Sequence, residues 1–274
     1  MSSTTKPRID ASLLKLGKKP ARYDRETKMF SAYRIGAQLP PMPAEFGFET
    51  VEPPDGWGMM GNGPDDSVAL GFEGCGDCFW AGSAHETMLD NKINGKTVNF
   101  TGKGVVSDYS AGTGYVIGND SSDQGTDPQE GYKYRQTTGI IDANGVRHKI
   151  GTFLALEPGN LQELYEAIYI FKRCGVGIQV PSTAMDQYNE GKPWSVVPGA
   201  SIEGGHYIPL VAKRNMPKLI TWGTVQRMTE QFYKKYNDES FIWISAEMLN
   251  AVGKTVGGFN IAQLQLDMGI ISTL

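Results

Sequence analysis

Residues 74–81 read Gly-Cys-Gly-Asp-Cys-Phe-Trp-Ala, and this stretch marks the passage from a loop into a helix. The residues before it are loop formers, rich in glycine, proline, asparagine and aspartate. Apolar residues recur after it with helical spacing as far as residue 91, which predicts a helix that starts at Cys78. A helix N-terminus lowers the pKa of a thiol, and the thiolate is the reactive form of cysteine. Cys78 is therefore a candidate nucleophile.

Three other interpretations of this cysteine pair stay open. Cys75 and Cys78 form a C-x-x-C motif, which can hold zinc or act as a redox pair. Zinc needs two further ligands at matching spacing, and a thioredoxin-like site needs a β-α-β frame, which the loop-rich surroundings do not supply. Both cysteines can also be small buried hydrophobic residues. The other cysteine and the histidines are not arranged in pairs: Cys174, His85, His148 and His206.

Composition sets the outer limits. The 274 residues suffice for one large domain or for two lobes that share an interface. A net charge of -4 and a pI near 5.5 argue against nucleic-acid binding. No apolar run approaches the roughly 18 residues of a membrane span, and residues 1–8 lack the apolar segment of a secretory signal. We therefore expect an intracellular protein, or one carried in a particle assembled inside a cell.

The pattern of residues divides the chain into an arm and a two-lobe domain. Residues 1 to about 60 are expected to form an extended arm with a proline-rich segment at residues 39–43. Residues 61–274 are expected to form the domain, with a helical lobe at about 61–175 and a β-rich lobe at about 176–274. The arm also carries a basic patch: Lys15, Lys18, Lys19, Arg22 and Arg25.

Further along the chain, caps and periodicity predict an α+β fold. Asn160 and Glu163 resemble a capping box at the start of a second helix, and Cys174–Gly175 is expected to end it. After that the apolar period changes from about four to two, which indicates strands. The predicted strands are residues 176–180, 206–212, 218–222 and 241–245. A short helix is predicted between the last two strands, at residues 229–236.

A thiol nucleophile needs a base, and the chain has three histidines. His85 lies seven residues after Cys78 on the same helix, about 10 Å along the axis, which favours a structural role. His148 lies in a polar turn and is expected to be solvated. His206 follows two glycines and opens a predicted strand, where it can meet a residue of the other lobe. His206 is the candidate base, and a structural strand-end histidine is the alternative.

These segments resemble the papain-like cysteine peptidases. Residues 75–83, Cys-Gly-Asp-Cys-Phe-Trp-Ala-Gly-Ser, resemble the nucleophile segment C-G-S-C-W-A-F-S of that family. Residues 219–224, Leu-Ile-Thr-Trp-Gly-Thr, resemble its N-S-W-G segment. The resemblance implies a papain-like two-lobe fold, with Cys78 as nucleophile and His206 as general base. It also implies that Trp222 shields the hydrogen bond that orients the histidine.

A closer resemblance is to a group of bacterial and phage-encoded papain-like proteins. Its members carry Gly-Asp-Cys, Gly-Gly-His and Thr-Trp-Gly motifs, which this chain has at residues 76–78, 204–206 and 221–223. The similarity covers residues 39 to about 248. It implies a bacterial or phage protein, and a place in the virion is one of the roles that the resemblance suggests.

The chain departs from the papain pattern where the histidine is oriented. Ile220 stands at the position of the orienting Asn, and its side chain cannot accept a hydrogen bond. Thr221 through its hydroxyl, or Asp77 through its carboxylate, can replace that Asn, although Asp77 also fits a helix N-terminus for electrostatic reasons. Asn62 aligns with an Asn of the phage-encoded group and is the candidate side-chain donor for the oxyanion, beside the Cys78 amide.

The sequence thus predicts a thiol hydrolase that attacks an acyl carbon of a peptide, isopeptide or cell-wall amide. The alternative is a catalytically idle papain-like protein that assembles with itself or with phage particle proteins, which the missing Asn and the long arm favour. No motif indicates a metal, a nucleotide or an organic cofactor, so no cofactor is expected. No nucleic-acid or membrane partner is expected either.

Overall fold

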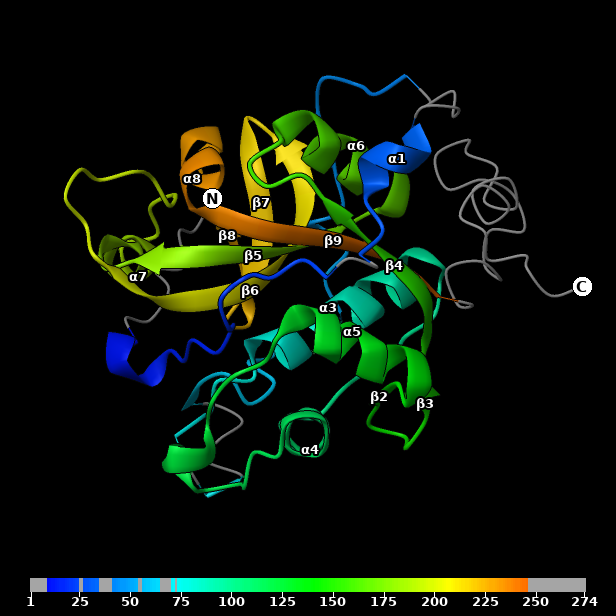
Figure 1. Ribbon diagram of the computed structural model, residues 1–274, viewed down its shortest axis with the longest axis vertical. Helices are drawn as coiled ribbons and strands as arrows, with labels where there is room; N and C mark the ends of the chain where they lie inside the picture. Colours follow the sequence, from blue (N-terminus) through cyan, green and yellow to red (C-terminus); the bar gives the residue numbers. More distant parts are fainter. Residues whose placement is uncertain are drawn as a thin grey trace, which may run out of the picture.

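The computed structural model describes residues 9–24, 27–34, 41–53, 56–64, 70–71 and 73–245. The two ends of the predicted arm and domain, residues 1–8 and 246–274, lie outside the described residues, as does part of the proline-rich segment. The elements follow one another in this order (Figure 1): η1 (Ala11–Leu13), α1 (Phe30–Arg34), β1 (Phe46–Gly47), α3 (Cys78–Ile93), α4 (Gly102–Thr113), η2 (Asp120–Ser122), α5 (Pro128–Thr137), β2 (Ile140–Ile141), β3 (Arg147–His148), β4 (Ile150–Leu156), α6 (Leu161–Phe171), β5 (Cys174–Pro181), α7 (Thr183–Asn189), β6 (Ile202–Arg214), β7 (Met216–Thr221), β8 (Thr224–Arg227), α8 (Glu230–Tyr236) and β9 (Asn237–Ser245).

A seven-stranded sheet organises the molecule, in the order β4-β9-β5-β6-β7-β8 with β1 paired to β6. Its pairings are antiparallel. The four strands expected in the second half of the chain are confirmed as β5, β6, β7 and β9, except that Trp222 lies in the turn after β7. The sheet also takes in β4 and β1, which come from the part of the sequence before residue 176. The α+β class is confirmed.

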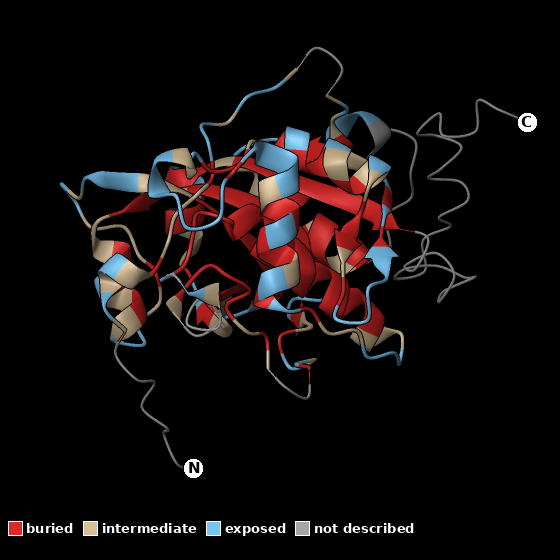
Figure 2. Cartoon of the chain, turned by 90° about the horizontal axis from the view of Figure 1, so that it is seen from below, coloured by how far each residue is buried: buried red, intermediate tan, exposed pale blue. Residues whose placement is uncertain are grey.

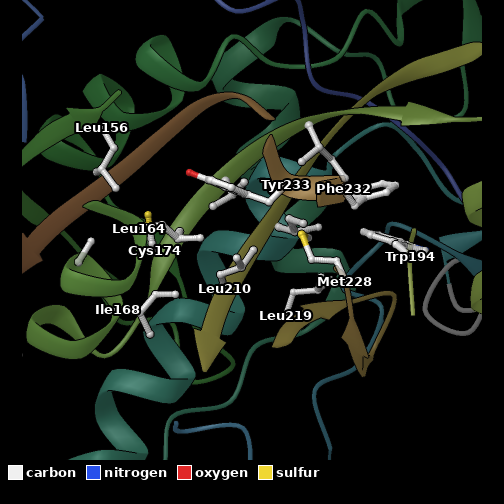
Figure 3. Close-up of a cluster of buried hydrophobic side chains, with 14 of the residues drawn as sticks. Leu156, Leu164, Ile168, Cys174, Trp194, Leu210, Leu219, Met228, Phe232 and Tyr233 are labelled. Atoms are coloured by element: carbon white, nitrogen blue, oxygen red, sulfur yellow. The ribbon is translucent and has the colours of Figure 1, made fainter. Parts of the chain in front are cut away.

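Both faces of the sheet are buried, because β6 sends alternate side chains to two different cores. Ile208 and Leu210 belong to a core with residues of α6 and α8. Tyr207 and Val211 belong to a second core with residues of α3, α4 and α5. Figure 3 shows part of the first core, and Figure 2 shows that the buried residues gather in the interior of the molecule.

The helix predicted from Cys78 is confirmed as α3 (Cys78–Ile93), and its residues from Cys78 to Asn91 are all buried. A helix that is buried on every side needs no polar face. Gly82 brings α3 close to β6, because a Cβ at this position would lie 2.6 Å from Cδ1 of Tyr207. Among the described residues, no helix is long and apolar enough to cross a lipid bilayer.

The end of the second predicted helix was placed wrongly. Asn160 caps α6 as expected, because its side chain accepts from the amide of Glu163. However, α6 ends at Phe171, and Lys172 takes the left-handed conformation at φ 69°. Gly175 lies in β5, where a Cβ would come 1.8 Å from the Tyr207 hydroxyl. This glycine therefore makes room for a tyrosine of the neighbouring strand and does not end the helix.

Candidate active site

Cys78 is the first residue of α3, and Asp77 is its N-cap residue. The Cys78 thiol accepts a hydrogen bond from the Tyr207 amide, with Sγ and N 3.4 Å apart. Tyr207 follows His206 on β6, so one strand supplies both the candidate base and a donor to the sulfur. The contact joins the helix of one core to the central strand of the sheet.

Thr221, at the end of β7, is the hydrogen-bond partner of His206. Nε2 of the histidine lies 2.8 Å from Oγ1 of Thr221. Nδ1 of His206 is buried and has no hydrogen-bond partner within the described part of the chain. When Nε2 donates its proton to Thr221, Nδ1 carries a lone pair and can accept a proton. Of the two predicted orienting groups, Thr221 and Asp77, the structure gives this position to Thr221.

Trp222 covers this hydrogen bond. Its ring stacks on His206, with centroids 4.7 Å apart and an angle of 18° between the planes. The stacking depends on a two-residue turn, because Thr221 pairs with Thr224 across the hairpin of β7 and β8. Both turn residues have positive φ, 43° at Trp222 and 70° at Gly223. Positive φ is unfavourable for a bulky side chain, so the fold bears some backbone strain to hold Trp222 over the histidine.

The predicted residues meet around one small cavity. Its lining includes Cys78, His206, Thr221, Trp222 and Asn62, and its volume is about 10 Å³. This volume is close to the smallest space that holds one water molecule. The Asn62 amide group donates to the Cys75 carbonyl at 3.1 Å, which fixes Asn62 beside the loop that leads into α3.

The predicted arm crosses the site. Residues 9–24 include a segment that runs between β6 and the helices α3 and α5 (Figure 1). The Lys18 amide donates to the Gly205 carbonyl at 2.9 Å, next to His206. On the other side, the Thr126 amide donates to the Gly17 carbonyl at 2.7 Å. The arm thus bridges the two sides of the cleft with backbone hydrogen bonds.

Gly17 passes directly over the nucleophile. A Cβ on Gly17 would lie 1.7 Å from the Gly76 carbonyl oxygen, and one on Gly125 would lie 2.2 Å from the Gly17 oxygen. Only glycines allow the three backbones to come this close. As a result, Cys78 is 1% exposed and His206 2% exposed. The Gly17 amide also lowers the pKa of the Cys78 thiol, although burial outweighs this effect.

The covered pair is uncharged. Burial raises the pKa of Cys78 to about 12, although the Tyr207 and Gly17 amides oppose this shift. Burial lowers the pKa of His206 to about 3. The thiolate that a helix N-terminus favours is therefore not the stable form of Cys78 while the arm covers the site, because water that would solvate the charges is excluded.

The other two histidines are structural. Nε2 of His85 lies 3.1 Å from the Trp57 oxygen and 2.9 Å from the Gly58 oxygen, so the ring holds the loop before α3. His148 is not solvated as expected. It is buried, because the hairpin of β2 and β3 turns its ring toward Phe100 and places Nε2 3.2 Å from Oδ2 of Asp142. The cysteines are unbridged. The described residues contain no group of three or more His, Cys, Asp or Glu that could hold a metal ion.

The sequence did not predict the buried network behind Tyr207. Its hydroxyl donates to Oε1 of Glu86 at 3.1 Å. The Glu86 carboxylate also accepts from Trp243 at 2.7 Å and from Arg135 at 3.2 Å. Glu86 lies on α3 eight residues after Cys78. The Glu86 carboxylate, within a helix that is buried on all sides, was the signal in the sequence for this network, because a buried carboxylate requires hydrogen-bond partners.

Comparisons with known proteins agree with this architecture. No protein-family profile matches the chain, and no curated protein matches it. Among solved structures, xylellain, a cysteine protease from Xylella fastidiosa, is similar with a TM-score of 0.62 and 11% identity, over 84% of this chain and 96% of that one. The proCathepsin B S9 from Trypanosoma congolense is similar with a TM-score of 0.57 and 10% identity, over 86% of this chain and 88% of that one. The digestive procathepsin L 3 of Tenebrio molitor is similar with a TM-score of 0.56 and 12% identity, over 85% of this chain and 77% of that one. The chain therefore has the papain-like α+β two-lobe fold.

Proposed function

We propose that the protein is a thiol hydrolase of the cysteine peptidase or amidase type, with Cys78 as nucleophile and His206 as general base. One observation carries the proposal. Thr221 engages Nε2 of His206 at 2.8 Å, while Nδ1 has no partner within the described residues and the ring shares a cavity with Cys78. A histidine held through one nitrogen, with the other free beside a thiol, is the arrangement that activates a cysteine nucleophile.

In the proposed reaction, Nδ1 of His206 takes the proton of the Cys78 thiol, and the thiolate attacks the acyl carbon of the substrate. The oxyanion accepts hydrogen bonds from the Cys78 amide, which has no intrahelical partner at the start of α3, and from the Asn62 side chain. His206 then gives its proton to the leaving amine. Water hydrolyses the thioester and restores the thiol. Thr221 and Trp222 hold the imidazole in place. The arm must leave the cleft before a substrate enters.

Finer assignments rest on sequence motifs alone and are part of the proposal. They are membership in the bacterial and phage-encoded group, a place inside the cell or in a phage particle, and a peptide, isopeptide or cell-wall amide as substrate. The idle alternative remains an outcome of the test below. Burial of Cys78 does not favour that alternative, since the arm itself covers the thiol.

The test measures the reaction of each cysteine with iodoacetamide at pH 6, in the full chain and in His206→Ala, by peptide mass spectrometry. Cys78 is expected to react during brief openings of the arm. Its alkylation rate is therefore proportional to the reactivity of the uncovered thiol. We expect His206→Ala to slow Cys78 at least tenfold and to leave Cys75 and Cys174 unchanged. Equal Cys78 rates in the two chains would show an idle site.

A further inference from the structure

The arm places a buried cation beside the candidate active site. Nζ of Lys18 lies 3.0 Å from Oδ2 of Asp238 and 3.0 Å from Oε1 of Glu239, and it donates to the Lys19 carbonyl at 2.8 Å. The Lys18 side chain is 0% exposed and that of Glu239 1% exposed. An ammonium group tolerates such burial only when its charge is paired and its donors are engaged.

A glycine on β5, Gly177, makes room for the Lys18 side chain. A Cβ at Gly177 would lie 2.7 Å from Cδ of Lys18 and 2.7 Å from Cγ of Glu239. Gly177 lies inside a strand, where glycine weakens the strand and commonly marks the close approach of another group. The absence of a side chain at Gly177 therefore leaves room for Lys18 to reach the two carboxylates.

The pocket offers more acceptors than Lys18 uses. The three ammonium donors are all engaged, by two carboxylate oxygens and one carbonyl. Oδ1 of Asp238 and Oε2 of Glu239 are buried without a hydrogen-bond partner in the part of the chain that the structure describes. A guanidinium group has five donors in one plane, so it can satisfy more of these oxygens than an ammonium group.

The pocket opens next to the reacting sulfur. The Lys18 amide donates to the Gly205 carbonyl, and the next residue on β6 is His206. One residue earlier in the arm, Gly17 lies against the loop that leads into Cys78, because a Cβ on Gly17 would come 1.7 Å from the Gly76 carbonyl oxygen. A peptide backbone that lies along this path, one residue from the nucleophile, therefore directs a side chain into the pocket.

Building on the proposed function, we propose that Asp238 and Glu239 form the specificity subsite of the enzyme, which takes an arginine or lysine side chain of the substrate. Lys18 occupies this subsite while the arm covers Cys78. The substrate class is thus a peptide or amide with a basic side chain close to the bond that is cleaved. Release of Lys18 exposes the nucleophile and the subsite together.

Three full-length variants test whether the pocket holds a cation. The rate of Cys78 with iodoacetamide at pH 8 is compared in Lys18→Met, Lys18→Arg and the matched control Lys19→Met, whose parent side chain is exposed. We expect Lys18→Met to raise the rate at least tenfold, and Lys18→Arg and Lys19→Met to stay within about threefold of the parent chain. Unchanged reactivity of Cys174, which is fully buried in the core, reports an intact fold.

The Lys18→Met chain is expected to keep its fold, because burial raises the pKa of Glu239 to about 7 and its carboxyl can take a proton when the ammonium is absent. If Lys18→Met reacts no faster than the parent chain, or if Lys18→Arg reacts as fast as Lys18→Met, the pocket does not recognise a cation and the proposal is wrong.

Thiol-directed probes test the subsite itself. Dipeptidyl acyloxymethyl ketones carry either arginine or norleucine at each position in turn, and the Cys78 thiolate displaces their carboxylate leaving group. In the Lys18→Met chain at pH 8, we expect one arginyl probe to label Cys78 at least tenfold faster than its norleucyl counterpart. Adding Glu239→Gln should reduce this preference to threefold or less.

The outcomes separate the two proposals. If Cys78 reacts with iodoacetamide in a His206-dependent way but arginyl and norleucyl probes label it equally, or neither labels it, the subsite is wrong and the thiol hydrolase stands. If its iodoacetamide reaction does not depend on His206, the proposed function fails, whatever the probes prefer.

Discussion

At the scale of single residues, the orientation of His206 depends on one threonine hydroxyl. Thr221 is a neutral partner whose hydroxyl can either donate or accept, so it selects the tautomer of the imidazole less strongly than an amide oxygen does. Trp222 restricts the ring from the side by stacking at 4.7 Å. The two contacts together supply the orientation that Ile220 cannot provide.

Thr221→Val keeps the size of the side chain and removes the hydrogen bond to Nε2, which lies 2.8 Å from Oγ1. A lost hydrogen bond of this kind is worth about 1 kcal/mol or somewhat more, so the His206-dependent iodoacetamide rate of Cys78 should fall about fivefold to tenfold. Thr224→Val, across the same turn, is the matched control and should change the rate less than twofold. Equal rates in the two variants would mean that Thr221 does not orient His206.

His85 makes the stability depend on pH. Burial lowers its pKa to about 4, so the folded chain binds fewer protons than the unfolded chain between pH 6.5 and 4. Its contribution is therefore fully present above pH 6.5 and is lost as the pH falls toward 4, by up to about 1.4 kcal/mol per pH unit. His206, whose pKa burial lowers to about 3, acts in the same direction.

The measurement is urea unfolding between pH 7 and pH 4.5. In His85→Gln, the free energy of unfolding should decline less steeply with falling pH than in the parent chain, by about one bound proton. The variant should also be less stable near pH 7, because the ring holds the carbonyls of Trp57 and Gly58. The same slope in both chains would contradict the assignment of a neutral buried His85.

At the scale of elements, the hairpin of β7 and β8 holds the strain that positions Trp222. Gly223 completes the turn at φ 70°, and a Cβ there would lie 3.2 Å from the Gly58 carbonyl carbon. The hairpin and the loop before α3 are therefore tightly apposed. A change at this turn should alter both the stability and the reactivity of the site.

Gly223→Ala and Gly145→Ala make a matched pair, because both glycines have positive φ but only Gly223 is crowded. The backbone strain alone should cost about 1–2 kcal/mol at either position. Gly223→Ala should cost about 1 kcal/mol more, and it alone should slow the iodoacetamide reaction of Cys78. Urea unfolding and cysteine labelling give the two readouts. Equal losses of stability with no change at Cys78 would show that the turn does not position the site.

The elements themselves were largely predictable from sequence. Local signals were sufficient for the start of α3, the Asn160 cap of α6 and the alternating strands β5, β6, β7 and β9. The errors arose where a distant residue decides. Gly175 was expected to end a helix, but it makes room for the Tyr207 hydroxyl. His148 was expected to be solvated in a polar turn, but its ring is buried against Phe100. Neither contact is encoded within the local stretch of sequence.

For the candidate site, the motifs predicted the residue types that meet but not the state of the pair. Cys78, His206, Thr221, Trp222 and Asn62 all line one cavity. The burial that leaves the pair uncharged comes from the arm, whose glycine and lysine contact the cleft through backbone groups. A basic, extended segment gives no local signal of where it lies, since its partners are about 60 to more than 200 residues away in the sequence.

At the scale of the whole molecule, the arm controls both the exposure of Cys78 and the charge state of the Cys78–His206 pair, and it occupies the proposed specificity subsite. It runs between β6 and α3 (Figure 1). Cys78 is buried beneath it, and Lys18 pairs with Asp238 and Glu239. Departure of the arm would rehydrate the sulfur and the imidazole at once. Rehydration removes the cause of both pKa shifts. The helix N-terminus and the mutual attraction of the two charges should then favour a thiolate and an imidazolium in the uncovered pair.

The most direct measurement is the pH profile of Cys78 alkylation by iodoacetamide from pH 5 to pH 9, in the parent chain and in Lys18→Met. In the parent chain, Cys78 reacts only during brief openings of the arm, so the rate should be at least tenfold lower than in Lys18→Met but should depend on pH in the same way. In Lys18→Met, the rate should be high at pH 6 and nearly flat above it, and His206→Ala should abolish the flat region. A Cys78 profile in the uncovered chain that rises with an ordinary thiol pKa near 8.5 would contradict an active Cys78–His206 pair.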